Sequence, residues 1–397
     1  MQISPKKILV KTAKVLGWFL LALLLIFIIV AVALQSSGVQ TWAVGKVTKL
    51  LSEKLKTDVR VGEVDIEFFK TAVLRNIFIA DQQKDTLLLA NEIKVNIGLL
   101  DLFGSEIYLN SAEIIGARVK LYRNAADSVF NYQFVVDAFA PDTLSVDTTA
   151  GLSFGIGKLA LDGVQFDMWD EGSGRFDLRT NIGKWTVDVD ELDLKNQKIA
   201  LNDMALNNSE VAFHMLVRDS AMLVKLPGDP TPLTFPGIGW DIAADKILLE
   251  KNHISYQDDN APQQKNALDF SHLDLQDLTL PINDFHYSDE GIMAKIDGAS
   301  FQDKSGFTLN ELSVEAAILP QKITAKDLVL RTPHSDFHNN TNLVFSDFND
   351  LTDFLHRVKL TSDFGKSTLA VSDLLLLAPA LHCEHFTFGK MEVFHLT

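Results

Sequence analysis

Hydrophobic and polar residues alternate along most of the chain after Thr57. Val59 and Val61 alternate with Arg60, and the alternation then shifts by one residue at Gly62–Glu63, as at a bulge or tight turn. The same period of two recurs in later stretches, among them residues 185–194 and 273–280. Short alternating runs separated by Asn, Asp, Gly and Ser predict antiparallel strands with one apolar and one solvated face.

The predicted fold is therefore mainly β, an elongated, twisted antiparallel sheet. No alternating helix–strand units occur, which argues against a parallel α/β enzyme fold. Helical spacing predicts an amphipathic helix over 38–56, which either lies on a membrane surface or caps the first strands; we favour the cap. A second pattern, over 346–358, predicts one short helix covering an end or edge of the sheet.

Residues 15–34 form an uninterrupted apolar run that is long enough, as a helix, to cross a bilayer. Four lysines precede it without any acidic residue, which predicts a cytoplasmic N-terminus and an exported body. A cleaved signal peptide is the alternative, but the run exceeds the usual apolar region of such peptides. The side chains that we expect to anchor the span in the membrane include Trp18, Phe19, Leu24, Phe27 and Val30.

Composition restricts the possible partners. The chain of 397 residues has 36 Lys and Arg against 52 Asp and Glu, a net charge of -16, and its body has no basic stripe. Binding to nucleic acid is therefore not expected, because phosphate contacts need clustered Lys and Arg. Cys383 is the only cysteine, which excludes an intrachain disulfide.

The sequence gives little support for a catalytic or metal-binding site. It contains no phosphate-binding glycine loop, no HExxH, no CxxC and no GxSxG. The stretch HCEH, residues 382–385, has donors suited to zinc, but in an extended strand they point alternately to opposite faces. The acid pairs Asp258–Asp259 and Asp289–Glu290 are typical of solvated turns, and no motif gives His286, His334 or His338 a catalytic role. We predict no enzyme activity, no metal and no cofactor.

Weak internal repeats suggest an array of similar strands. Leu161-Asp162-Gly163 resembles Ile296-Asp297-Gly298, and KIALNDMAL from Lys198 resembles KITAKDLVL from Lys322. The proline-rich stretch LPGDPTPLTFPG, from Leu226, is the clearest break. The predicted organisation is a basic N-terminus (1–14), a transmembrane helix (15–34), the cap helix (38–56), a first β region (57–226) and a second (227–397).

Over about residues 10–135 this order of elements resembles the N-terminal region of the AsmA and TamB superfamily of Gram-negative envelope proteins. The closest echoes are LRNIFIAD (74–81), TLLLANEIKVNIGLLDLF (86–103) and EIYLNSAEIIGARVKLYR (106–123). The resemblance implies an inner-membrane anchor with a periplasmic body, a long bent sheet whose concave side is an open apolar groove of the β-taco type. Members of the TamB type are longer and carry a C-terminal domain, so we expect a truncated sequence.

That resemblance implies a function in carrying or shielding phospholipids between the inner membrane and the outer membrane. It also implies an alternative, a scaffold for β-barrel assembly with an outer-membrane TamA- or BamA-type partner. A membrane-anchored hydrolase or metal enzyme is a third possibility. The same alternation would also fill the dry core of an ordinary sandwich. The side chains that we expect to line the groove are Val59, Val61, Ile66, Phe68, Ile77, Ile79, Leu87, Leu89, Val95, Ile97, Ile107, Leu109, Val119 and Leu121.

Overall fold

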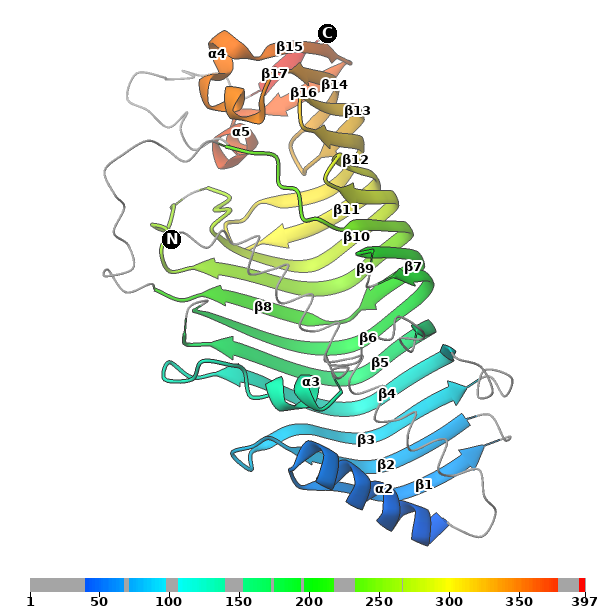
Figure 1. The fold of residues 1–397 in the computed structure, drawn as a ribbon. Coiled ribbons are helices and arrows are strands. Elements are labelled where there is room, and N and C mark those ends of the chain that lie inside the picture. Colours follow the sequence, from blue (N-terminus) through cyan, green and yellow to red (C-terminus); the bar gives the residue numbers. More distant parts are fainter. Residues whose placement is uncertain are drawn as a thin grey trace. The chain divides into compact units, whose positions relative to one another are not determined.

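The computed structural model of the protein describes residues 40–67, 71–97, 106–139, 153–172, 175–193, 196–217, 233–265, 267–377 and 393–396 (Figure 1). This part is mainly β, with 65% strand and 12% helix. The chain divides into two compact units, an N-terminal unit of Met1–Leu192 and a C-terminal unit of Asp193–Thr397. The boundary predicted after residue 226 falls among residues outside the described ranges.

The N-terminal unit contains helix α2 (Gln40–Leu55) and one sheet. The strands are β1 (Val59–Glu67), β2 (Thr71–Ala80), β3 (Thr86–Ile97), β4 (Glu106–Arg123), β5 (Ser153–Asp170) and β6 (Phe176–Asp193). They pair in chain order, antiparallel except for the parallel pair β4–β5. Parallel neighbours need a crossover connection, and this one carries α3 (Gln133–Phe139).

Two helices cover one face of this sheet. Figure 1 shows α2 and α3 in front of the strands, and α2 contacts both β1 and α3. The side chains of Leu51 and Leu55 in α2 are 2% exposed, so the helix packs through its apolar side. The cap predicted over 38–56 thus corresponds to α2, whereas the sequence pattern did not predict α3.

All six strands of the N-terminal unit bend at the same level. Strand register places Gly62, Asn76, Asn91, Gly116, Gly163 and Gly183 in one row across the sheet. Asn76, Gly116 and Gly163 have left-handed backbones, with φ of 54°, 58° and 60°. A Cβ at Gly116 would lie 2.3 Å from Nδ2 of Asn91, so the row admits only small residues there. The phase shift predicted at Gly62–Glu63 belongs to this row, which keeps one face apolar through the bend.

The C-terminal unit continues with β7 (Lys198–Asn207), β8 (Glu210–Met215), β9 (Asp241–Asp258), β10 (His272–Ser288), β11 (Gly291–Asp303), β12 (Thr308–Leu319), β13 (Lys322–Arg331), β14 (Asp336–Val344), β15 (Lys359–Phe364), β16 (Ser367–Ala370) and β17 (Val393–Leu396). Strands β9 to β15 form an antiparallel series. Strands β7 and β8 both run parallel to β9. The predicted antiparallel pairing therefore holds for most described pairs but not for all, because both units contain parallel pairs joined by long connections.

Helices occur near the end of the C-terminal unit. The helix predicted over 346–358 is a 3₁₀ turn, η2 (Phe348–Asp353), followed by α4 (Phe354–Arg357). Phe348 packs edge-on against Phe345, but Phe354 and Leu355 are 40% and 88% exposed. The expected shared apolar face is therefore only partly packed. A further helix, α5 (Val371–Leu377), was not predicted.

No helix within the described ranges is long and apolar enough to cross a membrane. The predicted span at 15–34, with Trp18, Phe19, Leu24, Phe27 and Val30, lies outside the described residues, as does HCEH at 382–385.

Candidate functional site

The residues expected to line a groove in the N-terminal unit lie mostly in a dry core. One face of β1–β5, here the N-terminal apolar face, packs beneath α2 and α3. The core contains nine of the predicted residues, none more than 9% exposed: Val59, Val61, Ile77, Ile79, Leu87, Val95, Leu109, Val119 and Leu121. Side chains this deeply packed leave no room for a ligand in the conformation described.

The remaining predicted residues are placed differently. Leu89 is 47% exposed and pairs with Phe78 and Arg118 on the opposite face. The cause is a bulge in β3, where Leu87 is the extra residue, so that Leu87 and Leu88 are both buried in the core. Phe68 lies outside the described residues. Ile66, Ile97 and Ile107 lie in strands, but their side chains are outside the description.

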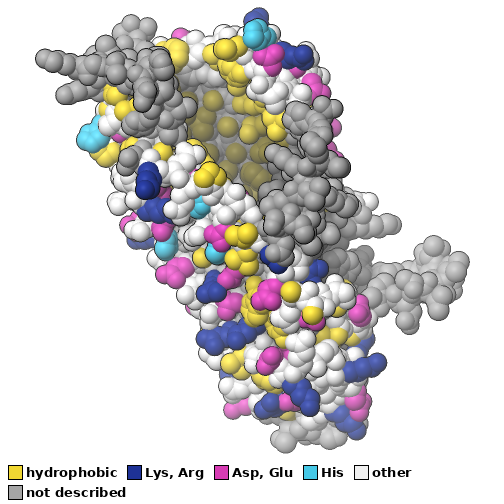
Figure 2. Space-filling view, turned by 90° about the vertical axis from the view of Figure 1, so that its left-hand side faces the viewer, with side chains coloured by type: hydrophobic (Ala, Val, Ile, Leu, Met, Phe, Trp, Pro, Cys, Tyr) yellow, Lys and Arg dark blue, Asp and Glu magenta, His cyan; other side chains and the backbone are white. Residues whose placement is uncertain are grey.

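The C-terminal unit has a comparable apolar face that is only half covered. Along β9–β13, side chains that share a face by strand register are mainly Ile, Leu and Ala. We call this surface the C-terminal apolar face. Most of its members are half-buried, and its large residues on β11, β12 and β13 include Ile292, Ile296, Leu312, Ile318, Ile323 and Leu330. Leu312 and Leu330 lie at one end of the face, against a buried cluster. Figure 2 shows a hollow lined with hydrophobic side chains at the height of these strands.

Described segments close the two ends of the strands that build this face. At one end, Leu268, Phe307 and Leu309 form a buried cluster that Leu376 of α5 joins, and the Leu268 N–H donates to the Leu376 carbonyl at 2.8 Å. At the other end, residues 233–240 form a strap. Its Phe235 packs edge-on against Phe348, and its Pro236 carbonyl accepts a hydrogen bond from the Tyr287 hydroxyl.

A row of small side chains runs along the middle of the C-terminal apolar face. Register aligns Ala294, Ala316 and Ala325 across β11, β12 and β13. A parallel row of larger residues, Ile292, Ile318 and Ile323, flanks them. Small residues between larger ones make a shallow trough that crosses the strands, and methyl and branched alkyl groups are its only side-chain lining there.

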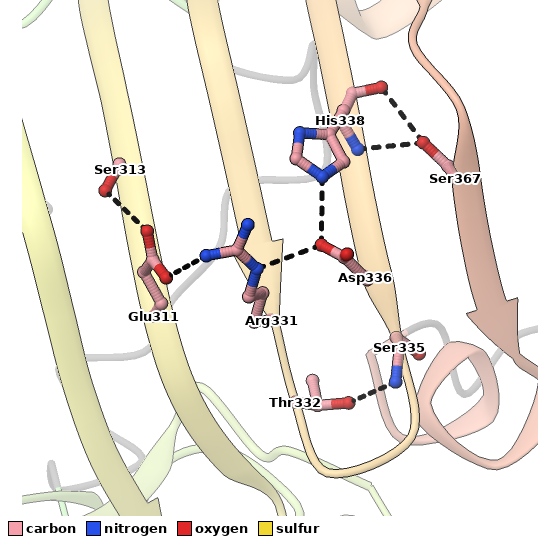
Figure 3. A network of polar contacts seen from close by, with 8 residues as sticks. All are labelled: Glu311, Ser313, Arg331, Thr332, Ser335, Asp336, His338 and Ser367. Atoms are coloured by element: carbon pink, nitrogen blue, oxygen red, sulfur yellow. Dashed lines mark hydrogen bonds and ion pairs between the residues drawn. The ribbon is translucent and has the colours of Figure 1, made fainter.

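The opposite face of the same strands is polar. Figure 3 shows Arg331 between Glu311 and Asp336, with His338 2.9 Å from the same Asp336 carboxylate. Hydrogen bonding to Glu311, then to Asp336, raises the pKa of Arg331. Lys326 likewise pairs with Glu315 at 2.7 Å. Arg331 and Lys326 are therefore neutralised on the side away from the hollow.

The acid pairs considered as catalytic groups serve turns. Asp258 accepts from the Asn260 backbone at 2.9 Å, and Asp289 accepts from the Gly239 N–H of the strap at 2.9 Å. Asp259 lies 2.8 Å from His214, and this contact is the main cause that lowers the pKa of Asp259. Within the described ranges, no three His, Cys, Asp or Glu side chains gather as metal ligands.

Histidine–aspartate pairs are common in the C-terminal unit, but they are separate from one another. His286 lies 2.7 Å from Asp241, and His272 lies 2.8 Å from Asp269. The His272–Asp269 pair is buried, and Asp269 also accepts from the backbone of Gln264 and Ser271, so it fixes a loop. His334 is exposed.

The two units differ in charge. Residues 193–397 contain 29 Asp and Glu against 16 Lys and Arg, a net -13, whereas residues 1–192 contain 23 against 20, a net -3, which together give the chain totals of 52 and 36. The unit with the half-covered apolar face is thus the strongly acidic one. Net negative charge disfavours an anionic ligand at long range.

No protein-family model matches the chain, and no curated protein matches its sequence. The candidate site therefore depends on geometry. The alternation of apolar and polar residues in the second half of the sequence could have identified the C-terminal apolar face. Its apolar positions include alanines at 294, 316 and 325, which are the signal for a row of small side chains. Periodicity alone could not distinguish it from the N-terminal apolar face, because the difference between them is which helices cover each one.

Proposed function

We propose that the protein is a membrane-anchored periplasmic bridge that shields or conducts phospholipids along an apolar β groove toward the outer membrane. The observation that carries the proposal is the C-terminal apolar face, whose Ile and Leu side chains are only half-buried, together with the hollow lined by hydrophobic side chains at the height of its strands (Figure 2). Acyl chains would lie against this face while headgroups stay in water. Each methylene removed from water contributes about 0.8 kcal/mol, so transfer along such a surface needs no catalytic residue.

The anchor in this proposal is the apolar segment 15–34, supported by its sequence pattern and the lysines before it. In this proposal the N-terminal unit, with its packed core, does not contact lipid, and the C-terminal unit is the part that does. Large apolar surfaces that remain in contact with water are uncommon without a binding role.

A matched pair of substitutions tests the proposal. Ala316 and Ala317 are adjacent, both half-buried, and point to opposite faces of β12. Full-length protein would be purified, and its phospholipid quantified after solvent extraction. We expect Ala316→Asp to reduce bound lipid several-fold and Ala317→Asp to leave it unchanged. Equal lipid content in both variants, with both folded by circular dichroism, would contradict the proposal.

The alternative function, a scaffold for β-barrel assembly, is favoured by strand β15. Every residue of β15 except Ser362 is exposed, and β15 pairs with β14 along Asn339–Val344. Exposed strands can add a strand from another protein. A photo-crosslinker at Thr361 would then trap an outer-membrane barrel protein, whereas the lipid proposal expects crosslinks to acyl chains from Ala316 and none to barrels from Thr361.

A further inference from the structure

The row of small residues on the C-terminal apolar face becomes polar where it reaches β14 and β15. Register places Thr341 beside Ala325, and Ser362 beside Thr341. Asn339, which is 5% exposed, is on the same face two residues before Thr341. An apolar row that ends in three polar side chains has the arrangement that an amphiphile requires.

The three side chains bond to one another. The Asn339 amide donates to Ser362 Oγ at 2.8 Å and to the Asp363 carbonyl at 3.3 Å. The Thr341 hydroxyl donates to Asn339 Oδ1, so the 3.0 Å contact between Thr341 Oγ1 and Ser362 Oγ uses the proton of Ser362. Three of the four polar protons are therefore engaged within the cluster and the fourth by the Asp363 carbonyl, whereas the hydroxyl oxygens each keep a free lone pair.

A cluster that has free hydrogen-bond acceptors but no free hydrogen-bond donors binds ligand groups that donate hydrogen bonds. Phosphate oxygens can only accept, so they gain nothing from it, whereas an ammonium or hydroxyl group gains a hydrogen bond. The described cations nearest the cluster are not on this face: Lys326 and Arg331 point to the opposite side and pair with Glu315 and Glu311. The net charge of -13 in this unit also disfavours an anionic lipid.

We propose that the Asn339–Thr341–Ser362 cluster holds the polar part of a bound phospholipid and selects a headgroup that donates hydrogen bonds and carries no net negative charge, as phosphatidylethanolamine does. This inference rests on the proposed function, since it assumes that acyl chains occupy the alanine row. The half-buried hydroxyls of Thr341 and Ser362 are the positioning groups, and buried Asn339 orients them.

Phosphatidylethanolamine and phosphatidylcholine separate the two contributions, because both are zwitterionic and only ethanolamine has N–H donors. Detergent-solubilised full-length protein would be titrated with these lipids and with phosphatidylglycerol, all with identical acyl chains, and bound lipid counted by native mass spectrometry. We expect phosphatidylethanolamine to bind about three- to tenfold more tightly than phosphatidylcholine, as one net hydrogen bond allows. Phosphatidylglycerol, whose hydroxyls also donate, should be weakened relative to phosphatidylethanolamine by its charge.

The variant Thr341→Val/Ser362→Ala should weaken binding of phosphatidylethanolamine and bring the ratio of ethanolamine to choline affinity to about one. Ser362→Ala alone serves if the double variant unfolds, and should reduce the ratio partly. Thr361→Val, on the opposite face of β15, is the matched control and should keep the wild-type ratio.

The outcomes separate the two proposals. Lipid binding that Ala316→Asp abolishes, but with equal affinity for ethanolamine and choline headgroups, overturns the headgroup inference and leaves the proposed function standing. A preference that survives Thr341→Val/Ser362→Ala also overturns the inference. Lipid binding that Ala316→Asp does not reduce overturns both, because lipid would then be held elsewhere, for example around the predicted span.

Discussion

Ile79 in the N-terminal unit and Ile318 in the C-terminal unit both point to the apolar face of an antiparallel strand, yet Ile79 is 2% exposed and Ile318 is half-buried. The strands around them have the same alternation of apolar and polar residues. The difference is the cover: α2 and the crossover helix α3 pack over the N-terminal apolar face, whereas the described segments near the C-terminal apolar face lie at its ends. Alternation thus specifies an apolar face, and other elements decide whether it becomes a core or a surface.

The largest expected contrast is in core packing. Ile79→Ala should destabilise the N-terminal unit by about 3 kcal/mol, because it leaves a cavity in a packed interior. Ile318→Ala should cost about 1 kcal/mol, since the side chain is already in contact with water. Both losses of stability can be measured on the full-length chain by urea unfolding and by amide hydrogen exchange, which reports on each unit separately. Similar costs at the two positions would mean that the C-terminal apolar face is packed as tightly as the N-terminal one.

Ion pairs give the second contrast. Arg123 donates through Nε to Asp170 at 2.8 Å, and the Asp170 side chain is 3% exposed. The bond to Asp170 is the main cause that raises the pKa of Arg123. Arg123→Ala should cost about 3 kcal/mol, because a buried carboxylate loses the guanidinium that neutralises it.

The comparison for this pair is Arg331→Ala in the polar network of Figure 3. Arg331 and its partners Glu311 and Asp336 are all substantially exposed, and solvent screens their attraction. The melting temperature should therefore barely change. The double variant Arg123→Leu/Asp170→Leu should recover part of the loss at Arg123, since no unpaired charge remains buried. A failure to recover would point to lost contacts of the Arg123 side chain with Phe130 instead.

Enlarging an alanine tests the space above each face. Ala112 is 4% exposed on the N-terminal apolar face, so Ala112→Phe should overpack the core and cost about 2 kcal/mol. Ala316→Phe should leave stability unchanged and reduce bound phospholipid, because the ring would fill the trough. Thermal unfolding and lipid extraction measure the two effects. A destabilised Ala316→Phe variant that keeps its lipid would argue that the trough is filled by protein.

The sequence predicted the class of fold better than the site. Alternation placed Val59, Ile77, Val95 and Leu109 correctly on one face, because a period of two needs no knowledge of distant residues. It misplaced Leu89, because a bulge in β3 itself, with Leu87 as the extra residue, shifts the phase, and three consecutive leucines do not show where it lies. The helices α3 and α5 were missed because they are short, with seven residues each, too few to show a helical period.

The parallel pairs were also beyond local pattern. Strands β4 and β5 read as ordinary alternating segments, and only the pairing of Ile114 with Leu161 across a long connection makes them parallel. The polar cluster was missed for a similar reason. Thr341 and Ser362 lie on two different strands, and their alignment with the alanine row exists only once β13, β14 and β15 are in register.

The smallest contrast concerns the glycines at which strands bend. Gly116 in the N-terminal unit and Gly298 in the C-terminal unit both have left-handed backbones, with φ of 58° and 86°. An alanine at either position costs about 1 kcal/mol for that conformation. At Gly116 the new Cβ would also lie 2.3 Å from Asn91 Nδ2, whereas nothing lies within 4 Å of a Cβ at Gly298.

We therefore expect Gly116→Ala to cost about 0.5 kcal/mol more than Gly298→Ala in urea unfolding, since Asn91 can relieve the contact only by moving. The variant Gly116→Ala/Asn91→Ala tests this cause, because it removes the amide that the methyl group meets. In a chain that already carries Asn91→Ala, the substitution Gly116→Ala should destabilise the protein no more than Gly298→Ala does. If Asn91→Ala does not reduce the extra loss of stability, that loss comes from the backbone of the shared row. The bend of the six N-terminal strands then depends on φ at Gly116 more than on the packing of Asn91 beside it.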